Sequence, residues 1–282
     1  MRENELPNFM PKGMKKLEED IRAHGELLFF SDYDGTLVSF TDDPAETRTP
    51  IEVLRSLREL GRLETVNLAV ISGRTIEDLK RMIPLDDIVL AGLHGMVVDY
   101  GNGEVCLRDD VEELALIIDE LTGEIRTKYF GVEGLIVEDK KFVVALHYRM
   151  FQGDERKLKE DLFDTIVKGS NKRLEVLEGD KIFEIRPKGW SKGVAVDQLR
   201  ERYGRDKPVL YLGDDTTDED AFRVLKGEDR AYPVKVVKEG GTARLETHAE
   251  YMVLGVDEVR KLLELLGSVC NNCGHTTVDY RE

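Results

Sequence analysis

Two aspartates separated by one residue, Asp32 and Asp34, are the most chemically suggestive feature of the sequence. They follow Ser31 and the apolar run Leu27–Phe30, which is too short for a typical helix and has no polar alternation, so it predicts a strand buried on both faces. Residues i and i+2 of an extended chain point to the same side, and Gly35 allows a sharp turn after them. Two crowded carboxylates repel each other unless a cation or a proton intervenes. The alternative is a buried strand that ends in an Asp-rich turn.

A second polar segment, Ser72-Gly73-Arg74, follows the apolar run Val66–Ile71. A helix is predicted directly after it, over Ile76–Met82, from its apolar spacing. A strand followed by a small hydroxyl, a glycine and a helix N-terminus offers backbone N–H groups and a positive dipole end to an anion. The segment therefore predicts an anion site, with a simple turn as the alternative.

Two further charged features lie late in the chain. Lys192 is placed at the start of the helix predicted over Ser191–Tyr203, and an acidic cluster follows the buried strand predicted over Val209–Leu212. The members of that cluster are Asp214, Asp215 and Asp218. Each feature alone also fits a surface lysine or a helix cap with solvated charge. Ligands of open α/β sheets bind beyond the carboxyl ends of the strands, so the joint appearance of all these features at strand ends favours one functional site.

The elements around these residues predict two domains. Strands alternate with helices up to residue 91 and again after residue 187, which is typical of a doubly wound parallel sheet. Between these stretches, hairpins separated by helices indicate an antiparallel sheet of the α+β type. We expect an α/β protein with a Rossmann-like core domain formed by residues 1–105 and 187–282, and an inserted α+β cap domain formed by residues 106–186.

Composition and charge restrict the class of function. The chain has 282 residues, 35% of them charged, and a formal net charge of −16. This charge argues against electrostatic capture by nucleic acid or by an anionic membrane. The sequence has no apolar run of the ~20 residues needed to span a bilayer and no apolar segment typical of a secretion signal. Three cysteines do not make a disulfide framework, so we expect a cytoplasmic protein.

These motifs resemble those of the haloacid dehalogenase superfamily of phosphohydrolases, and within it the trehalose-6-phosphate phosphatase family. The resemblance covers about residues 27–266. Two positions depart from the family pattern: Ser191 stands where Asn is frequent, and Asp180 where Lys is common. The matching segments are Asp32-Tyr33-Asp34-Gly35-Thr36, Ser72-Gly73-Arg74, Gly92-Leu93-His94-Gly95, His147-Tyr148-Arg149, Glu184-Ile185-Arg186-Pro187, Lys192-Gly193 and Gly213-Asp214-Asp215-Thr216-Thr217-Asp218.

The resemblance implies Mg²⁺-dependent hydrolysis of trehalose 6-phosphate through an aspartyl-phosphate. An ionised Asp32 attacks phosphorus without a separate base, while Asp34 protonates the leaving sugar oxygen and later activates water. Ser72 and Lys192 are expected to hold phosphoryl oxygens. The expected metal ligands are the carboxylates of Asp32 and Asp214 and the backbone carbonyl of Asp34, with Asp215 and Asp218 binding metal waters or orienting Lys192.

The resemblance also implies the substrate contacts. In the core domain these are Ser72, Gly73, Arg74, His94 and Lys192, and in the cap domain they are Glu138, Lys140, Arg149 and Glu184, facing sugar hydroxyls. Solvated hairpin charges are the alternative for the cap residues, and a structural histidine is the alternative for His94.

Other readings of the whole chain stay open at this point. The enzyme could hydrolyse another sugar phosphate, of the sucrose or mannosyl-glycerate type, or act as a phosphomutase. A regulatory domain that binds sugar phosphate without turnover is a third reading. We expect a monomer of trehalose biosynthesis, with trehalose-phosphate synthase as a possible associate. The segment Cys270-Asn271-Asn272-Cys273-Gly274-His275 is predicted to be a disordered tail in preference to half a zinc knuckle.

Overall fold

The structure, a computed structural model, describes residues 6–39, 47–107, 111–169, 173–179, 181–238 and 247–273. The chain forms two compact units, one made of Met1–Cys106 with Ser191–Glu282 and the other of Leu107–Trp190. The first unit is therefore assembled from two stretches that are far apart in the sequence. The residues of the second unit overlap those of the predicted cap domain and extend a few positions further along the chain.

An eight-stranded sheet forms the centre of the first unit, in the order β12-β11-β10-β1-β2-β3-β4-β5. The pairs from β12 through to β3 are parallel, and β4 pairs with β3 in the antiparallel direction. The strands are β1 (Leu27–Ser31), β2 (Val66–Ile71), β3 (Val89–Gly92), β4 (Val97–Asp99), β5 (Val105–Leu107), β10 (Val209–Gly213), β11 (Ala231–Val237) and β12 (Tyr251–Leu254). The fold class expected from the sequence is confirmed.

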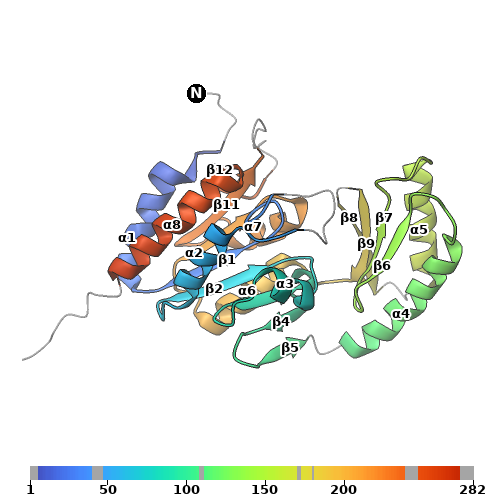
Figure 1. The fold of residues 1–282 in the computed structure, drawn as a ribbon, viewed down its shortest axis with the longest axis horizontal. Helices are drawn as coiled ribbons and strands as arrows, with labels where there is room; N and C mark the ends of the chain where they lie inside the picture. The colour runs from blue at the N-terminus through green and yellow to red at the C-terminus, as the bar shows by residue number, and fades with distance from the viewer. Residues whose placement is uncertain are drawn as a thin grey trace, which may run out of the picture. The chain divides into compact units, whose positions relative to one another are not determined.

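The sheet is covered by helices on both faces (Figure 1). Side chains of a strand alternate between faces, so Leu27 and Phe29 join one core cluster while Leu28 and Phe30 join the other. The first face carries α1 (Met14–His24), α2 (Ile51–Gly61), α3 (Ile76–Met82) and α8 (Gly255–Cys273), and the second carries α6 (Lys192–Tyr203) and α7 (Glu219–Leu225). Because β1 is buried on both faces and paired on both edges, its carboxyl end is a rigid place for chemical groups.

The last helix corrects one expectation. α8 runs to Cys273, so Cys270 does not lie in a disordered tail but is buried in the core at 1% exposure. Leu263, Leu266 and Cys270 continue the spacing of three and four residues that keeps one helix face apolar. His275 lies outside the described residues. Within the described parts of the chain, no helix is both long and apolar enough to cross a membrane.

The second unit is a four-stranded antiparallel sheet with two helices on one face. The strand order is β6-β7-β9-β8, with β6 (Ile136–Asp139), β7 (Val144–His147), β8 (Leu174–Gly179) and β9 (Ile182–Pro187). Phe183 and Ile185 of β9 pack against α4 (Val111–Lys128) and α5 (Glu155–Gly169) in a core of their own. The alternating residues Glu184 and Arg186 therefore point to the opposite face of this sheet.

Candidate active site

Three neighbouring parallel strands bring three of the predicted site residues to one edge of the first sheet. β1 lies between β2 and β10, and each of the three strands is followed at once by a polar residue. The Asp32 N–H donates to the Leu212 carbonyl at 2.8 Å, and the Ser72 N–H donates to the Ala91 carbonyl at 2.9 Å. These bonds hold the strand ends together, so Asp32, Ser72 and Asp214 emerge at the same edge.

Lys192 forms a buried ion pair with Asp32. Ser191 caps α6 by accepting a hydrogen bond from the Val194 N–H, which makes Lys192 the first residue of the helix. The Lys192 Nζ lies 2.7 Å from Asp32 Oδ1 and 2.8 Å from Asp218 Oδ1. Burial alone would lower the pKa of Lys192, but the charges of Asp218 and Asp32 outweigh it and raise that pKa. The ammonium group therefore stays charged at neutral pH.

Both oxygens of Asp218 are already engaged within the protein. Oδ1 accepts hydrogen bonds from Lys192 and from the Tyr211 hydroxyl, the latter at 2.6 Å. Oδ2 accepts from the backbone N–H groups of Asp214 and Asp215 at 3.1 and 3.0 Å. A fully buried carboxylate with four such bonds is suited to orienting Lys192 and the loop after β10. Of the two predicted roles for Asp218, the geometry supports orientation.

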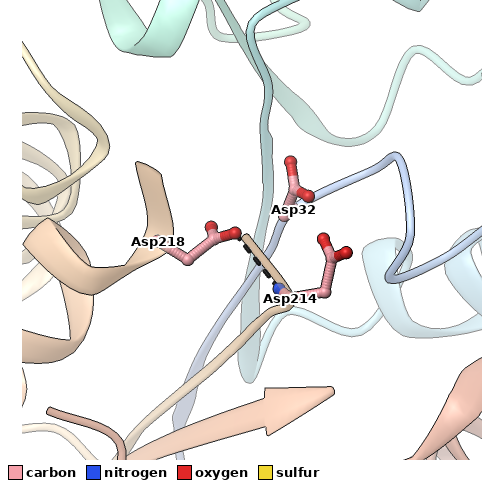
Figure 2. Close-up of side chains that lie close together, drawn as sticks. All are labelled: Asp32, Asp214 and Asp218. Carbon is pink, nitrogen blue, oxygen red and sulfur yellow. Dashed lines mark hydrogen bonds between the residues drawn. The ribbon is translucent and has the colours of Figure 1, made fainter. Parts of the chain in front are cut away.

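Asp214 is placed differently. Asp32, Asp214 and Asp218 each have a carboxylate oxygen within 4.8 Å of the others, and Figure 2 shows the Asp214 carboxylate pointing towards Asp32. Asp214 Oδ1 is buried and has no hydrogen-bond partner among the described residues. Burial, followed by the charge of Asp218, raises the pKa of Asp214 to about 7.

Asp32 lies in the same negative environment. Burial raises the pKa of Asp32 against the opposing charge of Lys192, and the charges of Asp218 and Asp214 add to the increase. An orphan carboxylate oxygen beside a second carboxylate of raised pKa is the electrostatic state that a divalent cation relieves. The donor set therefore fits a hard cation with oxygen ligands.

Asp215 does not belong to the cluster of carboxylates formed by Asp32, Asp214 and Asp218. It is exposed and accepts a hydrogen bond from the Thr216 N–H at 2.6 Å, capping the short 3-10 helix Thr216–Asp218. Asp218 completes a capping box with it. For Asp215, the structure therefore agrees with the helix cap that the sequence left open as an alternative.

Asp34 is held by Arg74 through two hydrogen bonds. Arg74 Nε donates to Asp34 Oδ2 and Nη2 donates to Oδ1, both at 2.6 Å. This is the bidentate geometry in which a planar guanidinium matches a carboxylate. Arg74 was predicted as a substrate contact, and the structure places its side chain against Asp34, the predicted acid.

Ser72, Gly73 and His94 form one compact turn. Ser72 Oγ accepts from the Arg74 N–H at 3.2 Å, and the Ser72 carbonyl accepts from the His94 N–H at 2.7 Å. His94 is buried with a left-handed φ of 58°, and a Cβ on Gly73 would lie only 2.9 Å from its ring. The imidazole thus packs directly over the glycine, which supports the structural reading of this histidine.

Three of the four predicted sugar-binding residues share one face of the sheet in the second unit. Glu138 and Glu184 both pair with Ala145, on opposite sides of it. Lys140 Nζ lies 2.7 Å from Glu184 Oε1, and both side chains are 11% exposed. Arg149 is exposed just beyond β7. The structure therefore brings Lys140 and Glu184 into contact and leaves Arg149 at the surface of the unit.

Sequence reasoning gave no role to two members of these networks, His147 and Tyr211. His147 Nε2 lies 2.8 Å from Glu138 Oε2, and the hydrogen bond of this imidazole is the main cause that lowers the pKa of Glu138. Tyr211 supports Asp218, and no local pattern distinguishes it from other apolar residues of a buried strand. The spacing of His147 on β7, opposite the strand of Glu138, is a signal that could have identified the first pair.

The chain matches known proteins over most of its length. The sequence profile of the trehalose-phosphatase family matches residues 30–257. A probable trehalose-phosphate phosphatase of Oryza sativa subsp. japonica is 30% identical over 90% of this chain and 70% of its own length. A probable trehalose-phosphate phosphatase of Arabidopsis thaliana is 32% identical over 86% of this chain and 72% of its own.

Solved structures agree with this result. A trehalose-6-phosphate phosphatase related protein aligns with a TM-score of 0.73 at 28% identity, covering 87% of this chain and 99% of that one. The C-terminal domain of the C. albicans trehalose-6-phosphate phosphatase aligns with a TM-score of 0.76 at 26% identity, covering 94% and 99%. A haloacid dehalogenase-like hydrolase from Bacteroides thetaiotaomicron, at 16% identity and a TM-score of 0.56 over 86% and 99%, shares the fold.

Proposed function

Because this chain belongs to the trehalose-phosphatase family, we propose that it hydrolyses trehalose 6-phosphate to trehalose and inorganic phosphate. The observation that carries the proposal is the buried Asp32–Lys192 pair beside Asp214 at the carboxyl ends of adjacent strands. A nucleophile, a fixed cation and a free carboxylate are the groups needed for phosphoryl transfer through a covalent intermediate.

In the first step of the proposed reaction, an Asp32 carboxylate oxygen forms a bond to phosphorus while the bond from phosphorus to the sugar oxygen breaks. Lys192 favours the ionised form of Asp32 at 2.7 Å. It also places positive charge where phosphoryl oxygens gain charge in the transition state. Ser72 is assigned a further phosphoryl oxygen, because its hydroxyl lies in the turn at the end of β2.

Asp34 is assigned the two proton transfers. Its carboxyl proton passes to the departing sugar oxygen, leaving trehalose and an ionised Asp34. A water molecule then attacks the aspartyl-phosphate and gives its proton to Asp34, while the bond from phosphorus to Asp32 breaks and restores the carboxylate. One residue thus serves as acid in the first step and as base in the second.

We assign Mg²⁺ to the carboxylates of Asp32 and Asp214 and to the backbone carbonyl of Asp34. When bound, such a cation neutralises the carboxylates and polarises the phosphoryl group. Asp218 is assigned the orientation of Lys192, because its own oxygens already accept four hydrogen bonds. Asp215 is an exposed helix cap, so we assign it at most a contact to the metal through a water molecule.

Sugar recognition is assigned to the charged face of the second unit. The proposal gives the sugar hydroxyls to Glu138, Lys140, Arg149 and Glu184. The Lys140–Glu184 ion pair supports this role because its charged groups are held before substrate arrives. The runner-up substrates are sugar phosphates of the sucrose or mannosyl-glycerate type.

The test is phosphate release across a panel of sugar phosphates, with Asp32→Asn as the matched inactive control. We expect preference for trehalose 6-phosphate, loss of activity in chelator and recovery with Mg²⁺. Preference for another sugar phosphate would move the chain to the runner-up reading. An isomerised sugar phosphate in place of free phosphate would indicate a phosphomutase, and binding without turnover would indicate a regulatory domain.

A further inference from the structure

Arg74 restricts the orientation of the Asp34 side chain, the predicted acid. Both Asp34 oxygens accept from one guanidinium at 2.6 Å, and the Arg74 and Asp34 side chains are 12% and 25% exposed. We propose that Arg74 is a positioning residue that fixes the Asp34 carboxylate for proton transfer, and not a contact for the phosphoryl group. This inference rests on the proposed function, because it concerns the acid of that reaction.

Arg74 is itself held from several sides. Its carbonyl accepts from the Leu93 N–H at 2.8 Å, and its own N–H donates to Ser72 Oγ at 3.2 Å. Its Nη2 also donates to Thr47 Oγ1 at 3.2 Å, and the guanidinium carbon lies 5.6 Å from the centre of the Tyr33 ring. A side chain anchored in this way can transmit its position to Asp34, whereas a mobile surface arginine could not.

The fork also leaves acceptor sites on the Asp34 carboxylate unoccupied by Arg74. A carboxylate has two oxygens with about four acceptor sites, and a bidentate arginine occupies one site on each oxygen. A second site therefore remains on each oxygen for the proton that passes to the sugar oxygen and, later, for the proton taken from water. Rotation of the carboxylate away from the reacting atoms would break two charge-assisted hydrogen bonds. The geometry thus confines the acid without blocking it.

If Arg74 acts through Asp34, the effect of removing Arg74 on kcat/KM should depend on the leaving group of the substrate. A sugar alkoxide is a poor leaving group and needs the proton of Asp34, whereas nitrophenolate departs without one. The ratio kcat/KM reports only the steps up to the first irreversible one, which in this mechanism is formation of the phosphoenzyme. A residue that acts through Asp34 should therefore matter for trehalose 6-phosphate and not for para-nitrophenyl phosphate. A residue that binds phosphate should matter for both.

The experiment measures kcat/KM for both substrates in Arg74→Ala. Because misplacement of a catalytic group costs on the order of 100-fold, we expect a loss of about that size with trehalose 6-phosphate. With para-nitrophenyl phosphate we expect a loss below about threefold. Arg74→Lys, which cannot form the fork, should show a smaller contrast of the same sign. Arg81→Ala is the matched control, because Arg81 is an exposed arginine of α3, the helix that follows Arg74, and pairs with Asp78.

A double-mutant cycle distinguishes positioning of Asp34 from direct contact with the phosphoryl group. Adding Arg74→Ala to Asp34→Asn should cause less than about a threefold further loss, because the group that Arg74 positions has already been disabled. Equal losses with both substrates, or a full further loss in the Asp34→Asn background, would overturn the proposal. If Arg74→Ala does not fold by thermal melt, Arg74→Lys and Arg74→Gln carry the same comparison. If the wild type prefers another alkyl phosphate, that substrate replaces trehalose 6-phosphate, so failure of the proposed function is seen separately.

Discussion

Asp214 should make the stability of the metal-free protein fall as the pH rises. Burial and the charge of Asp218 raise its pKa from 3.8 to about 7, so the folded state binds this proton more tightly than the unfolded state does. The stabilisation is fully present below the unfolded pKa and is lost as the pH rises through about 7. Between about pH 5 and about pH 8 the loss amounts to about 2.5 kcal/mol. For a protein of this size that corresponds to roughly 5–10 °C in Tm.

The assay compares thermal melts of the wild type and Asp214→Asn in chelator at these two pH values. The difference between the two proteins isolates Asp214 from the many other carboxylates, and Asp215→Asn, which changes an exposed aspartate of the same loop, is the matched control. We expect the wild type to lose stability relative to Asp214→Asn at the higher pH. Mg²⁺ should restore the wild type there and have a weaker effect on the variant. A wild-type minus variant difference that does not change with pH would refute the reasoning.

Three further predictions concern residues whose partners the structure identifies. Tyr211→Phe removes a buried hydrogen bond to the Asp218 carboxylate, and we expect it to lower the free energy of unfolding by about 1.5–3 kcal/mol, measured by denaturant titration. Gly73→Ala should lower kcat/KM because its Cβ would meet the His94 ring, and adding His94→Gly should recover part of the loss; losses that simply multiply would contradict this contact. Glu184→Ala should lower kcat/KM for trehalose 6-phosphate by about 10- to 100-fold and leave an aryl phosphate nearly unchanged, whereas parallel losses would remove the residue from sugar recognition.

The architecture could be predicted because its signals are local. The run Leu27–Phe30 has the uniform apolarity of a strand buried on both faces, and the structure buries every residue of β1, Ser31 included. The helices that cover the sheet follow from apolar spacing in the same way. Asp32 and Lys192 are far apart in the sequence, but their proximity could be predicted. Asp32 follows a predicted strand and Lys192 begins a predicted helix, and in a parallel sheet these ends meet at the same edge.

The partners of the charged side chains could not be predicted in this way. Arg74 stands at a helix start beside a predicted anion site, where an arginine that binds phosphate and one that binds a carboxylate have the same sequence context. Tyr211 occupies an ordinary apolar position of β10, and only the path of the following loop brings Asp218 to its hydroxyl. The end of α8 was missed because Cys270 was considered as part of a tail or as a zinc ligand, and not as a small apolar residue that continues the helix face.

Because the first unit is formed by two separate chain segments, its strands are synthesised at different times. β1 has two neighbours, β2 and β10, and β10 follows only after the whole second unit has been made. At the usual rate of translation, roughly 10–30 s separate the appearance of Asp32 from that of Lys192. During that interval β1 can pair with β2 but presents one edge of unpaired backbone N–H and C=O groups on a largely apolar strand, which is a site for association with other nascent chains. The same strand that makes the site rigid in the finished protein is therefore prone to association while the chain is still being synthesised.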